Sequence, residues 1–561
     1  MMIGIDLGTT NSLVACFRNG KAELIPNRLG KYLTPSVVSV DEDGNVYIGE
    51  TAKIRGMMYP LETAKVFKRS MGTDKKYHLG NRDFSPTELS SLLLRSLKED
   101  SEVFLGEEVT EAIISVPAYF NDFQRKATKK AGELAGLKVN RIINEPTAAA
   151  LAYGINKKDE SRFLVFDLGG GTFDVSILEL YGSIMEVHAI SGDNYIGGED
   201  FTDILCKMFF ERCAISMDEL DVCTFNEIFN AAEECKCAFS KTNEVVMNCK
   251  VDEQLYETTI TLREYEEACS ELLDKLRRPI EKSIKDANVT LNDIDQVILV
   301  GGATRLPIIR RFVERLFGRK CNYSVDPDKA VALGAALQCG MKARDKEIQE
   351  VILTDVCPYT LGTEIVVNNG VFDEAGHYLP IIERNTVIPV SRTQTVYTAH
   401  DNQTVVNVKV LQGESRKAYY NLLLGEVSIP VPAGPKGKEA VDITYTYDVN
   451  SLLEVEVFVH STGIRRKVII QNEQNRISEE EANLQLQKLQ YLKQNPRDEE
   501  ENQLLLLRGE RLYQEVPSNR YEIDCALTEF EQALSRQNRR EIEKVRKKLV
   551  QLFNEFDTNL A

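Results

Sequence analysis

The spacing of apolar residues changes twice along the chain, and each change marks a predicted domain boundary. From residue 1 to about residue 347, short apolar runs alternate with stretches in which apolar residues recur every three or four positions. Such runs are typical of buried strands, and such stretches are typical of amphipathic helices. Residues 1–347 are therefore predicted to form a layered α/β domain, and the pattern of its first half returns in its second half.

One repeating unit of this domain can be followed residue by residue. Gln296–Val300 is predicted to be a strand, and Gly301 and Gly302 are predicted to form the turn after it. A helix follows, because a proline stands near its first position and Gly318 stands just past its end.

The pattern differs in the rest of the chain. Between residues 357 and 470, apolar and polar residues alternate, as in 406–410 and 453–457, which predicts an antiparallel β domain. Residues 348–356 are predicted to be a linker with an apolar segment at 351–354, and an ordinary edge strand is the alternative. Residues 471–561 are predicted to be helical, and Ser478 with Glu481 forms a capping box at the first helix.

Length, charge and cysteine content narrow the class of protein. A chain of 561 residues predicts roughly three or four domains. The net charge of −18 argues against nucleic acid as the main partner, because phosphate binding requires a basic face. There is no apolar run of membrane-spanning length and no signal-peptide pattern before the first strand, so we expect a cytoplasmic protein without a membrane partner. The twelve cysteines lack metal-ligand spacing, and the close neighbours Cys235 and Cys237 are expected to be reduced packing residues.

Two similar glycine-rich loops carry the strongest chemical signal. Residues 4–12 read GIDLGTTNS, and residues 166–176 read FDLGGGTFDVS. In each loop an apolar strand ends on an aspartate, Asp6 or Asp167, and small residues follow whose backbone amides can approach phosphate oxygens. Carboxylates at these positions suit a hydrated Mg²⁺. Either loop alone would fit an ordinary tight turn, but the pair predicts two halves around a polyphosphate.

Five motifs in order carry a resemblance to a known family. They are GIDLGTTNS (4–12), INEPTAAALAYG (143–154), DLGGGTFD (167–174), LVGGATRLP (299–307) and DPDKAVALGAA (326–336). Together they resemble the seventy-kilodalton heat-shock chaperones of the DnaK type, and the short length and divergent β domain are most similar to the bacterial HscC-type members.

The resemblance implies a multidomain fold. An α/β actin-like ATPase domain, a duplicated ribonuclease-H-like fold, covers residues 1–347, and an interdomain linker covers 348–356. An antiparallel β-sandwich peptide-binding domain covers 357–470, and an α-helical lid covers 471–561.

The resemblance also implies hydrolysis of ATP to ADP and phosphate with Mg²⁺, and K⁺ is a candidate further ion. Lys68 is expected to orient the attacking water and to offset negative charge near the γ-phosphate, and Lys65 is the alternative alignment. The other implied catalytic residues are Glu145, Asp167, Thr172 and Asp174. Asp6 and Asp167 are implied to organise the Mg²⁺ through water.

The implied nucleotide contacts lie on both loops and on two later segments. Around the phosphates they are Gly8, Thr9, Thr10, Asn11, Gly169, Gly170, Gly171 and Thr172. Around the adenosine they are Glu233, Lys236 and Ser240, expected on one helix, and Gly301, Gly302, Ala303, Arg305 and Asp328. Arg305 is expected to stack on the adenine. Cys237 and Ala303 depart from residues common in the family, so we expect looser nucleotide binding.

Peptide binding is expected in the β domain, through backbone hydrogen bonds and apolar pockets. The implied cleft residues are Thr363, Ile365, Val366, Val396, Ala399, Val406 and Val408. Alternating β-branched residues are also ordinary sheet core, and for several of these residues that interpretation is the better one. Residues 372–380 are expected to be an insertion that reshapes a loop near the cleft.

The implied partners are extended segments of unfolded polypeptides, a J-domain co-chaperone and a nucleotide-exchange factor. The residues implied to connect the ATPase domain to the cleft or to receive the J-domain partner are Arg141, Asn144, Pro146, Thr147, Val351, Leu353 and Asp355. The leading hypothesis is an ATP-driven peptide-binding chaperone. The alternatives are a weak-ATPase holdase or exchange partner of another chaperone, a small-molecule kinase, and a filament former.

Overall fold

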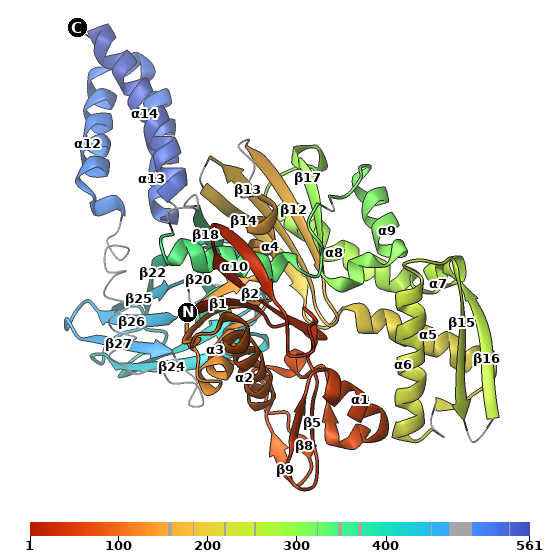
Figure 1. The fold of residues 1–561 in the computed structure, drawn as a ribbon. Helices are drawn as coiled ribbons and strands as arrows, with labels where there is room; N and C mark the ends of the chain where they lie inside the picture. The colour runs from red at the N-terminus through yellow and green to blue at the C-terminus, as the bar shows by residue number, and fades with distance from the viewer. Residues whose placement is uncertain are drawn as a thin grey trace.

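Two six-stranded sheets form the centre of the N-terminal part of the chain (Figure 1). This computed structural model describes residues 1–154, 160–182, 184–217, 220–251, 254–322, 324–345, 351–368, 373–449, 452–470, 496–537 and 539–560. The expected capping box at Ser478 and Glu481 lies outside the described residues.

The first sheet defines a first lobe and has the strand order β11-β10-β1-β2-β3, with β4 paired to β2. Its strands are β1 (Met2–Asp6), β2 (Asn11–Arg18), β3 (Lys21–Ile25), β4 (Thr34–Pro35), β10 (Glu111–Val116) and β11 (Lys138–Asn144). Smaller elements of this lobe are β5 (Val38–Val40), β6 (Val46–Ile48), α1 (Glu50–Met58), β7 (Thr63–Ala64), β8 (Tyr77–Leu79), β9 (Arg82–Phe84), α2 (Pro86–Leu105) and α3 (Asp122–Leu134).

The second sheet defines a second lobe and has the order β17-β12-β13-β14-β18-β21. Its strands are β12 (Ser161–Leu168), β13 (Phe173–Tyr181), β14 (Ile184–Asp193), β17 (Gln296–Val300), β18 (Ile352–Val356) and β21 (Val387–Ile388). Around it are α5 (Gly198–Cys213), α6 (Val222–Ala238), β15 (Glu244–Val251), β16 (Gln254–Thr261), α7 (Leu262–Ala268), α8 (Ser270–Asp286) and α9 (Pro307–Phe317). The predicted strand at 296–300 and the helix between Pro307 and Gly318 are confirmed.

The two lobes share one strand arrangement. In the first, β1 runs antiparallel to β2 and parallel to β10, and in the second, β12 runs antiparallel to β13 and parallel to β17. Each of the two glycine-rich loops is therefore the turn of an equivalent hairpin. Since parallel neighbours need a long crossover, each unit carries helices outside its sheet.

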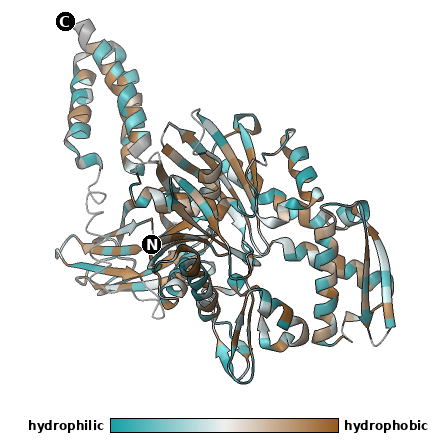
Figure 2. Cartoon of the chain, viewed as in Figure 1, coloured by the Kyte–Doolittle hydropathy of each residue, from teal (hydrophilic) through white to brown (hydrophobic). Residues whose placement is uncertain are grey.

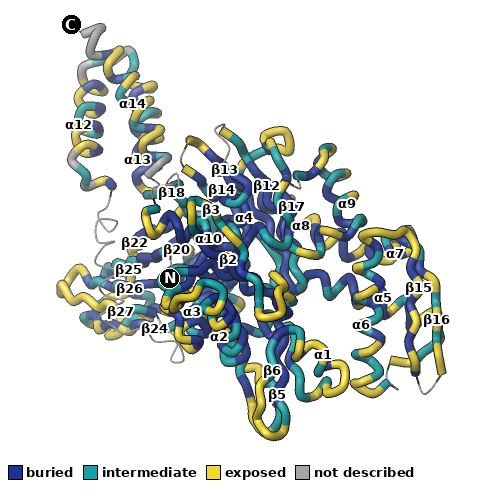
Figure 3. The backbone as a smooth tube through the Cα atoms, viewed as in Figure 1, coloured by how far each residue is buried: buried dark blue, intermediate teal, exposed yellow. Residues whose placement is uncertain are grey.

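Two helices pack between the sheets, α4 (Glu145–Gly154) and α10 (Ala330–Lys342). They approach closely because Gly334 has no side chain: a Cβ there would lie 1.7 Å from the carbonyl oxygen of Ala148. Hydrophobic residues gather in the strands and on the inner helix faces, and the same segments are buried (Figures 2 and 3). This shared core joins the lobes along α4, which begins directly after β11.

The expected linker contributes a strand to the second lobe. Residues 352–354 of β18 pair in parallel with 184–186 of β14, and Asp355 and Val356 pair with β21. This apolar segment is therefore a strand, but it is not an edge strand, because β18 lies between β14 and β21 in the sheet order. Because β14 belongs to the second lobe and β21 follows the first strands of the β domain, β18 ties the two parts of the chain together.

The strand-rich middle of the chain consists of two four-stranded sheets around one core. One has the order β20-β19-β23-β24 and the other β22-β25-β26-β27. The strands are β19 (Leu361–Asn368), β20 (Asp373–Ile382), β22 (Val390–Tyr397), β23 (Val405–Gln412), β24 (Leu422–Pro430), β25 (Ala440–Tyr447), β26 (Leu453–Val459) and β27 (Arg465–Ile470). From Asp373 onward the expected insertion is the strand β20 paired with β19, so the prediction of a reshaped loop is wrong for 373–380.

Three helices end the described chain: α12 (Glu500–Glu515), α13 (Arg520–Arg536) and α14 (Arg539–Leu560). They share a core of their own that includes Leu527, Phe530, Leu534 and Leu549. Pro496 and Pro517 begin short turns before α12 and α13, as expected for a residue that cannot continue a helix. Within the described residues, no helix is long and apolar enough to cross a membrane.

Candidate functional site

The two glycine-rich loops lie against each other where the lobes meet. A Cβ on Gly170 would lie 2.4 Å from Thr10 Cγ2, and a Cβ on Gly171 would lie 2.6 Å from Thr9 Cγ2. The turn of the second loop is closed by the Gly169 amide, which donates to the Thr172 carbonyl at 3.1 Å. Only residues without side chains fit this approach, which accounts for Gly170 and Gly171.

The first loop needs its glycine for a similar reason. A Cβ on Gly8 would lie 2.0 Å from the Asn11 carbonyl oxygen. Thr9 and Thr172 are buried, whereas the Asn11 side chain at the start of β2 is exposed. The structure therefore brings the predicted phosphate residues of both lobes to one place.

A cluster of buried charged groups lies behind the loops. Lys68 is only 3% exposed, and its Nζ donates to Glu145 Oε1 at 2.6 Å. Asp6 ends β1, Asp167 lies near the end of β12 and Asp174 lies at the start of β13. Sheet order places these residues together because β1 and β12 end at the same interface between the lobes.

Burial and mutual repulsion perturb the carboxyl groups. Burial, reinforced by the Glu145 charge, raises the pKa of Asp6 to about 7 and the pKa of Asp174 to about 8. The same two causes, in the same order, raise the pKa of Asp167 well above its usual range. Lys68 thus lies among three buried carboxyls and the partly buried Asp6, and a further cation would stabilise their ionised forms.

Mg²⁺ fits this cluster. The Asp167 Oδ2 atom is buried and accepts no hydrogen bond from the residues that the structure describes, and the surrounding ligand candidates are oxygens. Among the residues that the structure describes, no group of three or more His, Cys, Asp or Glu is arranged to hold a metal directly. A Mg²⁺ ion held by Asp6 and Asp167 through its waters stays a prediction.

Sequence reasoning missed two groups that position these carboxylates. The Ser115 hydroxyl donates to Asp6 Oδ1 at 3.0 Å, and the Tyr119 amide donates to Asp174 Oδ1 at 3.0 Å. Ser115 lies on β10, the parallel neighbour of β1. Only the order of strands in the sheet identifies it, and the sequence pattern carries no signal for that order.

The predicted adenosine residues on α6 contact the start of α5. Lys236 Nζ donates to the Gly198 carbonyl at 2.8 Å and to Glu233 Oε2 at 2.6 Å. Ala303 lies beside them, since a Cβ on Gly198 would lie 3.2 Å from the Ala303 Cβ and 3.4 Å from Lys236 Nζ. Ser240 lies two residues beyond the end of α6, so the prediction that one helix carries all three residues is wrong for Ser240.

The loop after β17 reaches the same region. Gly301 has φ +83°, and a Cβ there would lie 2.9 Å from Asp167 Oδ1. Arg305 Nε donates to Asp328 Oδ2 at 2.7 Å, and its guanidinium also pairs with Asp326. Two carboxylates therefore hold the guanidinium plane that was expected to stack on adenine, and Gly302 lies next to Asp328.

Asn144 connects the linker to the first lobe. Its Nδ2 donates to both carboxylate oxygens of Asp355, at 2.8 and 2.7 Å, and its Oδ1 accepts from Arg125 at 2.7 Å. Burial raises the pKa of Asp355, and the charges of Arg125 and Arg141 oppose that shift. The charge of Arg141 and the side-chain amide of Asn144 thus both stabilise the ionised form of Asp355.

The other residues predicted to connect the N-terminal domain to the peptide cleft are apolar or buried. Pro146 and Thr147 are buried at the start of α4. Val351 and Leu353 pack against the core between the lobes, whereas Ile352 is exposed.

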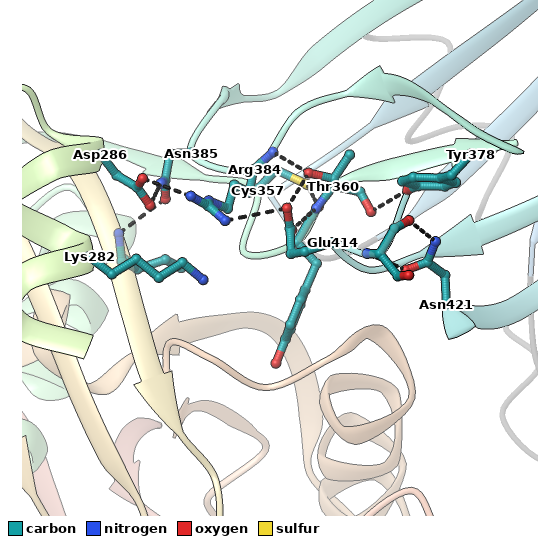
Figure 4. Close-up of polar contacts among 12 residues, drawn as sticks. Lys282, Asp286, Cys357, Thr360, Tyr378, Arg384, Asn385, Glu414 and Asn421 are labelled. Carbon is teal, nitrogen blue, oxygen red and sulfur yellow. Dashed lines mark hydrogen bonds and ion pairs between the residues drawn. The ribbon is translucent and has the colours of Figure 1, made fainter. Parts of the chain in front are cut away.

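A polar network joins the second lobe to the β domain (Figure 4). Arg384 Nη2 lies 2.7 Å from Asp286 Oδ1 at the end of α8, and Arg384 Nη1 lies 3.4 Å from Glu414. Glu414 in turn accepts from the amide and hydroxyl of Thr360. Asn385 accepts from the Ile190 amide of β14 at 3.1 Å. The β domain is therefore docked on the second lobe through β18 and through this network.

The predicted peptide residues fall into two groups. Thr363 and Val408 are each 1% exposed, and Val408 belongs to the core of the sandwich. Ile365, Val366, Val396, Ala399 and Val406 are partly exposed. β19 pairs with β23 only at residues 361–362, and beyond that point these two strands do not pair.

Comparison with known proteins defines the class. The family model described as Hsp70 protein matches residues 2–560. The chain is 39% identical over 520 residues to the chaperone protein DnaK of Thermotoga neapolitana, and the alignment covers 90% of this chain and 86% of that protein. A mixed-sheet N-terminal part, a strand-rich middle and C-terminal helices agree with that class. The chain belongs to the Hsp70 family.

Proposed function

We propose that this chain is an ATP-dependent chaperone, in which ATP binding and hydrolysis between the lobes control the capture and release of extended apolar peptide segments by the β domain. Membership of the Hsp70 family supports both the ATPase and the chaperone activity. The observation that carries the proposal is the chain of contacts from the buried cluster through Glu145 and Asn144 to the linker residue Asp355.

In the proposed hydrolysis, water attacks the γ-phosphorus of ATP, the bond to the bridging oxygen breaks, and ADP and phosphate are formed. Lys68 is buried and held by Glu145, so its charge is preorganised and costs little reorganisation in the transition state. Bound Mg²⁺ would offset charge on the phosphates. Thr172 and the backbone amides of both glycine-rich loops would position the γ-phosphate, as phosphoryl transfer mainly requires.

In the proposed coupling, the docked linker and the released linker belong to two states of the protein. ATP shifts the population toward the state in which it binds more tightly, and peptide does the same for the other state. The pairing of β18 with β14 and the bonds of Asn144 to Asp355 support the docked arrangement as one of these states.

Several finer assignments belong to the same proposal. We infer an actin-like ATPase fold over 1–347, a linker over 348–356, a peptide-binding domain over 357–470 and a lid over 471–561. A J-domain co-chaperone would bind near Arg141, Asn144 and the linker, and an exchange factor would act on the lobes. We infer a cytoplasmic location from the likeness to the chaperone protein DnaK. The HscC-type assignment and a K⁺ site stay predictions.

The test measures how fast the full chain releases a fluorescent apolar heptapeptide. The complex is formed with ADP and Mg²⁺ and then mixed with excess unlabelled peptide and either ADP or ATP. Acceleration by ATP is expected. Binding without acceleration would favour a holdase or an exchange partner, and absence of peptide binding would reopen the kinase and filament hypotheses.

A further inference from the structure

Lys68 and Arg69 are consecutive residues whose side chains contact different parts of the protein. The residue before their turn, Val66, has φ +56°, a left-handed conformation that β-branched residues rarely adopt. Lys68 reaches Glu145 within the first lobe. The Arg69 side chain extends across the interface and contacts the second lobe. An uncommon backbone conformation at this point suggests that the direction of both side chains matters.

Arg69 makes two bonds across the interface between the lobes. Its Nε donates to the Gly171 carbonyl of the second glycine-rich loop at 2.8 Å. Its Nη2 lies 2.7 Å from Asp200 Oδ2 in the first turn of α5. The side chains of Arg69 and Asp200 are only 21% and 29% exposed. Charge-assisted bonds in such a partly buried place are stronger than bonds on an open surface.

The Arg69 contacts act on a loop whose other two glycine carbonyls are bonded by the second lobe. The amides of Gly198 and Glu199, at the start of α5, donate to the carbonyls of Gly169 and Gly170 at 2.8 and 2.9 Å. Asp200 also accepts from the Gly197 amide at 2.7 Å. Each carbonyl of the three glycines thus has a donor, and the donor for Gly171 comes from the opposite lobe.

The space around Gly171 agrees with this arrangement. A Cβ at that position would lie 2.6 Å from Arg69 Nε and 2.6 Å from Thr9 Cγ2. Arg69 therefore packs directly on the loop at the point where the two lobes touch. Any motion that separates the lobes here must break both Arg69 bonds.

We propose that Arg69 is a positioning residue that ties the first lobe to the Gly171 carbonyl and Asp200 of the second, and that this tie slows the release of nucleotide. The inference rests on the proposed function, because it requires nucleotide between the lobes. Arg69 itself is not a catalytic residue, since its guanidinium is occupied by protein acceptors.

The experiment measures the dissociation rate of a fluorescent ADP from the full chain in Mg²⁺, after mixing with excess unlabelled ADP. Arg69→Met keeps the apolar stem and removes both bonds, and we expect release to be about tenfold faster, which corresponds to about 1.4 kcal/mol. Arg69→Lys keeps the charge without the planar fork and should be intermediate. Single-turnover hydrolysis of bound ATP should change by less than about threefold in both variants.

Arg55→Met is the matched control. Arg55 pairs with Glu62 and donates to Ser39, so its loss removes an arginine whose bonded partners lie in the first lobe. Its release rate should equal that of the wild type. Asp200→Asn removes the charge of the acceptor that pairs with Arg69 Nη2. The double variant Asp200→Asn with Arg69→Met should release ADP only slightly faster than Arg69→Met alone.

Three outcomes would overturn the inference. They are a wild-type release rate in Arg69→Met, an equal effect of Arg55→Met, and loss of hydrolysis with unchanged release, which would make Arg69 catalytic. If Arg69→Met lacks the native circular dichroism spectrum, Arg69→Lys is used in its place, and a wild-type release rate of ADP in that variant would overturn the inference. Failure of the wild-type chain to bind the fluorescent ADP would instead refute the proposed nucleotide site.

Discussion

Asn144 and Glu145 are neighbours in the chain, yet their side chains belong to two different sites. Asn144 ends β11 and binds both carboxylate oxygens of Asp355 in the linker. Glu145 begins α4 and binds Lys68 in the buried cluster between the lobes. A shift of α4 by a fraction of an ångström would change both sets of bonds. This pair is the shortest covalent connection between the proposed ATPase site and the linker.

Replacing Lys68 should impair hydrolysis more than binding. In Lys68→Met, we expect single-turnover ATP hydrolysis to fall by about 10²–10³-fold, because a preorganised charge near the reacting phosphate is lost. ATP affinity, measured by calorimetry, should change by less than about tenfold. Lys65→Met is the control for the alternative alignment and should have the smaller effect. A hydrolysis rate in Lys68→Met equal to that of the wild type would show that Lys68 does not take part in hydrolysis.

Weakening the linker contact should uncouple ATP from peptide release. Asp355→Asn replaces one of the two acceptors for Asn144 with a donor, and hydrogen bonds to charged groups contribute about 1.5–3 kcal/mol. We expect the acceleration of peptide release by ATP to fall about tenfold. Ile352→Thr, at an exposed position of the same strand, is the control and should behave like the wild type. Full acceleration in Asp355→Asn would argue against this coupling route.

A larger side chain on the inner face of β23 should obstruct peptide binding. Val406 packs partly against the sandwich core, and we expect Val406→Phe to weaken heptapeptide affinity at least tenfold in fluorescence anisotropy. Val405→Phe places the same ring on the opposite face of the strand, where Val405 is 45% exposed, and should leave affinity unchanged. Equal affinity in both variants would exclude Val406 from the cleft.

One buried carboxyl should make stability depend on pH. Burial raises the pKa of Glu199 from 4.5 to about 7, an effect that Arg69 and Lys236 oppose. The folded state then binds more protons than the unfolded state, so the free energy of unfolding falls as pH rises from about 4.5 to about 7. At pH 8 this cost is about 1–3 kcal/mol.

Glu199→Gln should remove that cost. Its thermal midpoint without nucleotide should exceed that of the wild type at pH 8, and the difference should shrink toward pH 5. Glu267→Gln, which changes an exposed carboxyl on α7, is the control. A constant difference between Glu199→Gln and wild type across this pH range would show that Glu199 does not titrate as expected.

Much of the fold follows from the sequence by itself. Period-two alternation and helical spacing report which faces of an element are buried, and they located β17, α9 and the strands of the sandwich. The aspartates at the strand ends and the glycines after them identified, as a pair, the two loops that lie against each other between the lobes. The same reasoning could not choose between core and cleft for Val408, since a β-branched residue suits both.

The tertiary structure alone decided which distant residues meet. Glu145 lies 77 residues from Lys68, Asp355 lies 211 residues from Asn144, and Gly171 lies 102 residues from Arg69. Local periodicity contains no information on the order of strands in a sheet or on how two sheets face each other. Those choices depend on the packing of α4 and α10 between the lobes and on the docking of β18. The sequence by itself therefore determined the elements and the chemical groups, and tertiary packing determined their partners.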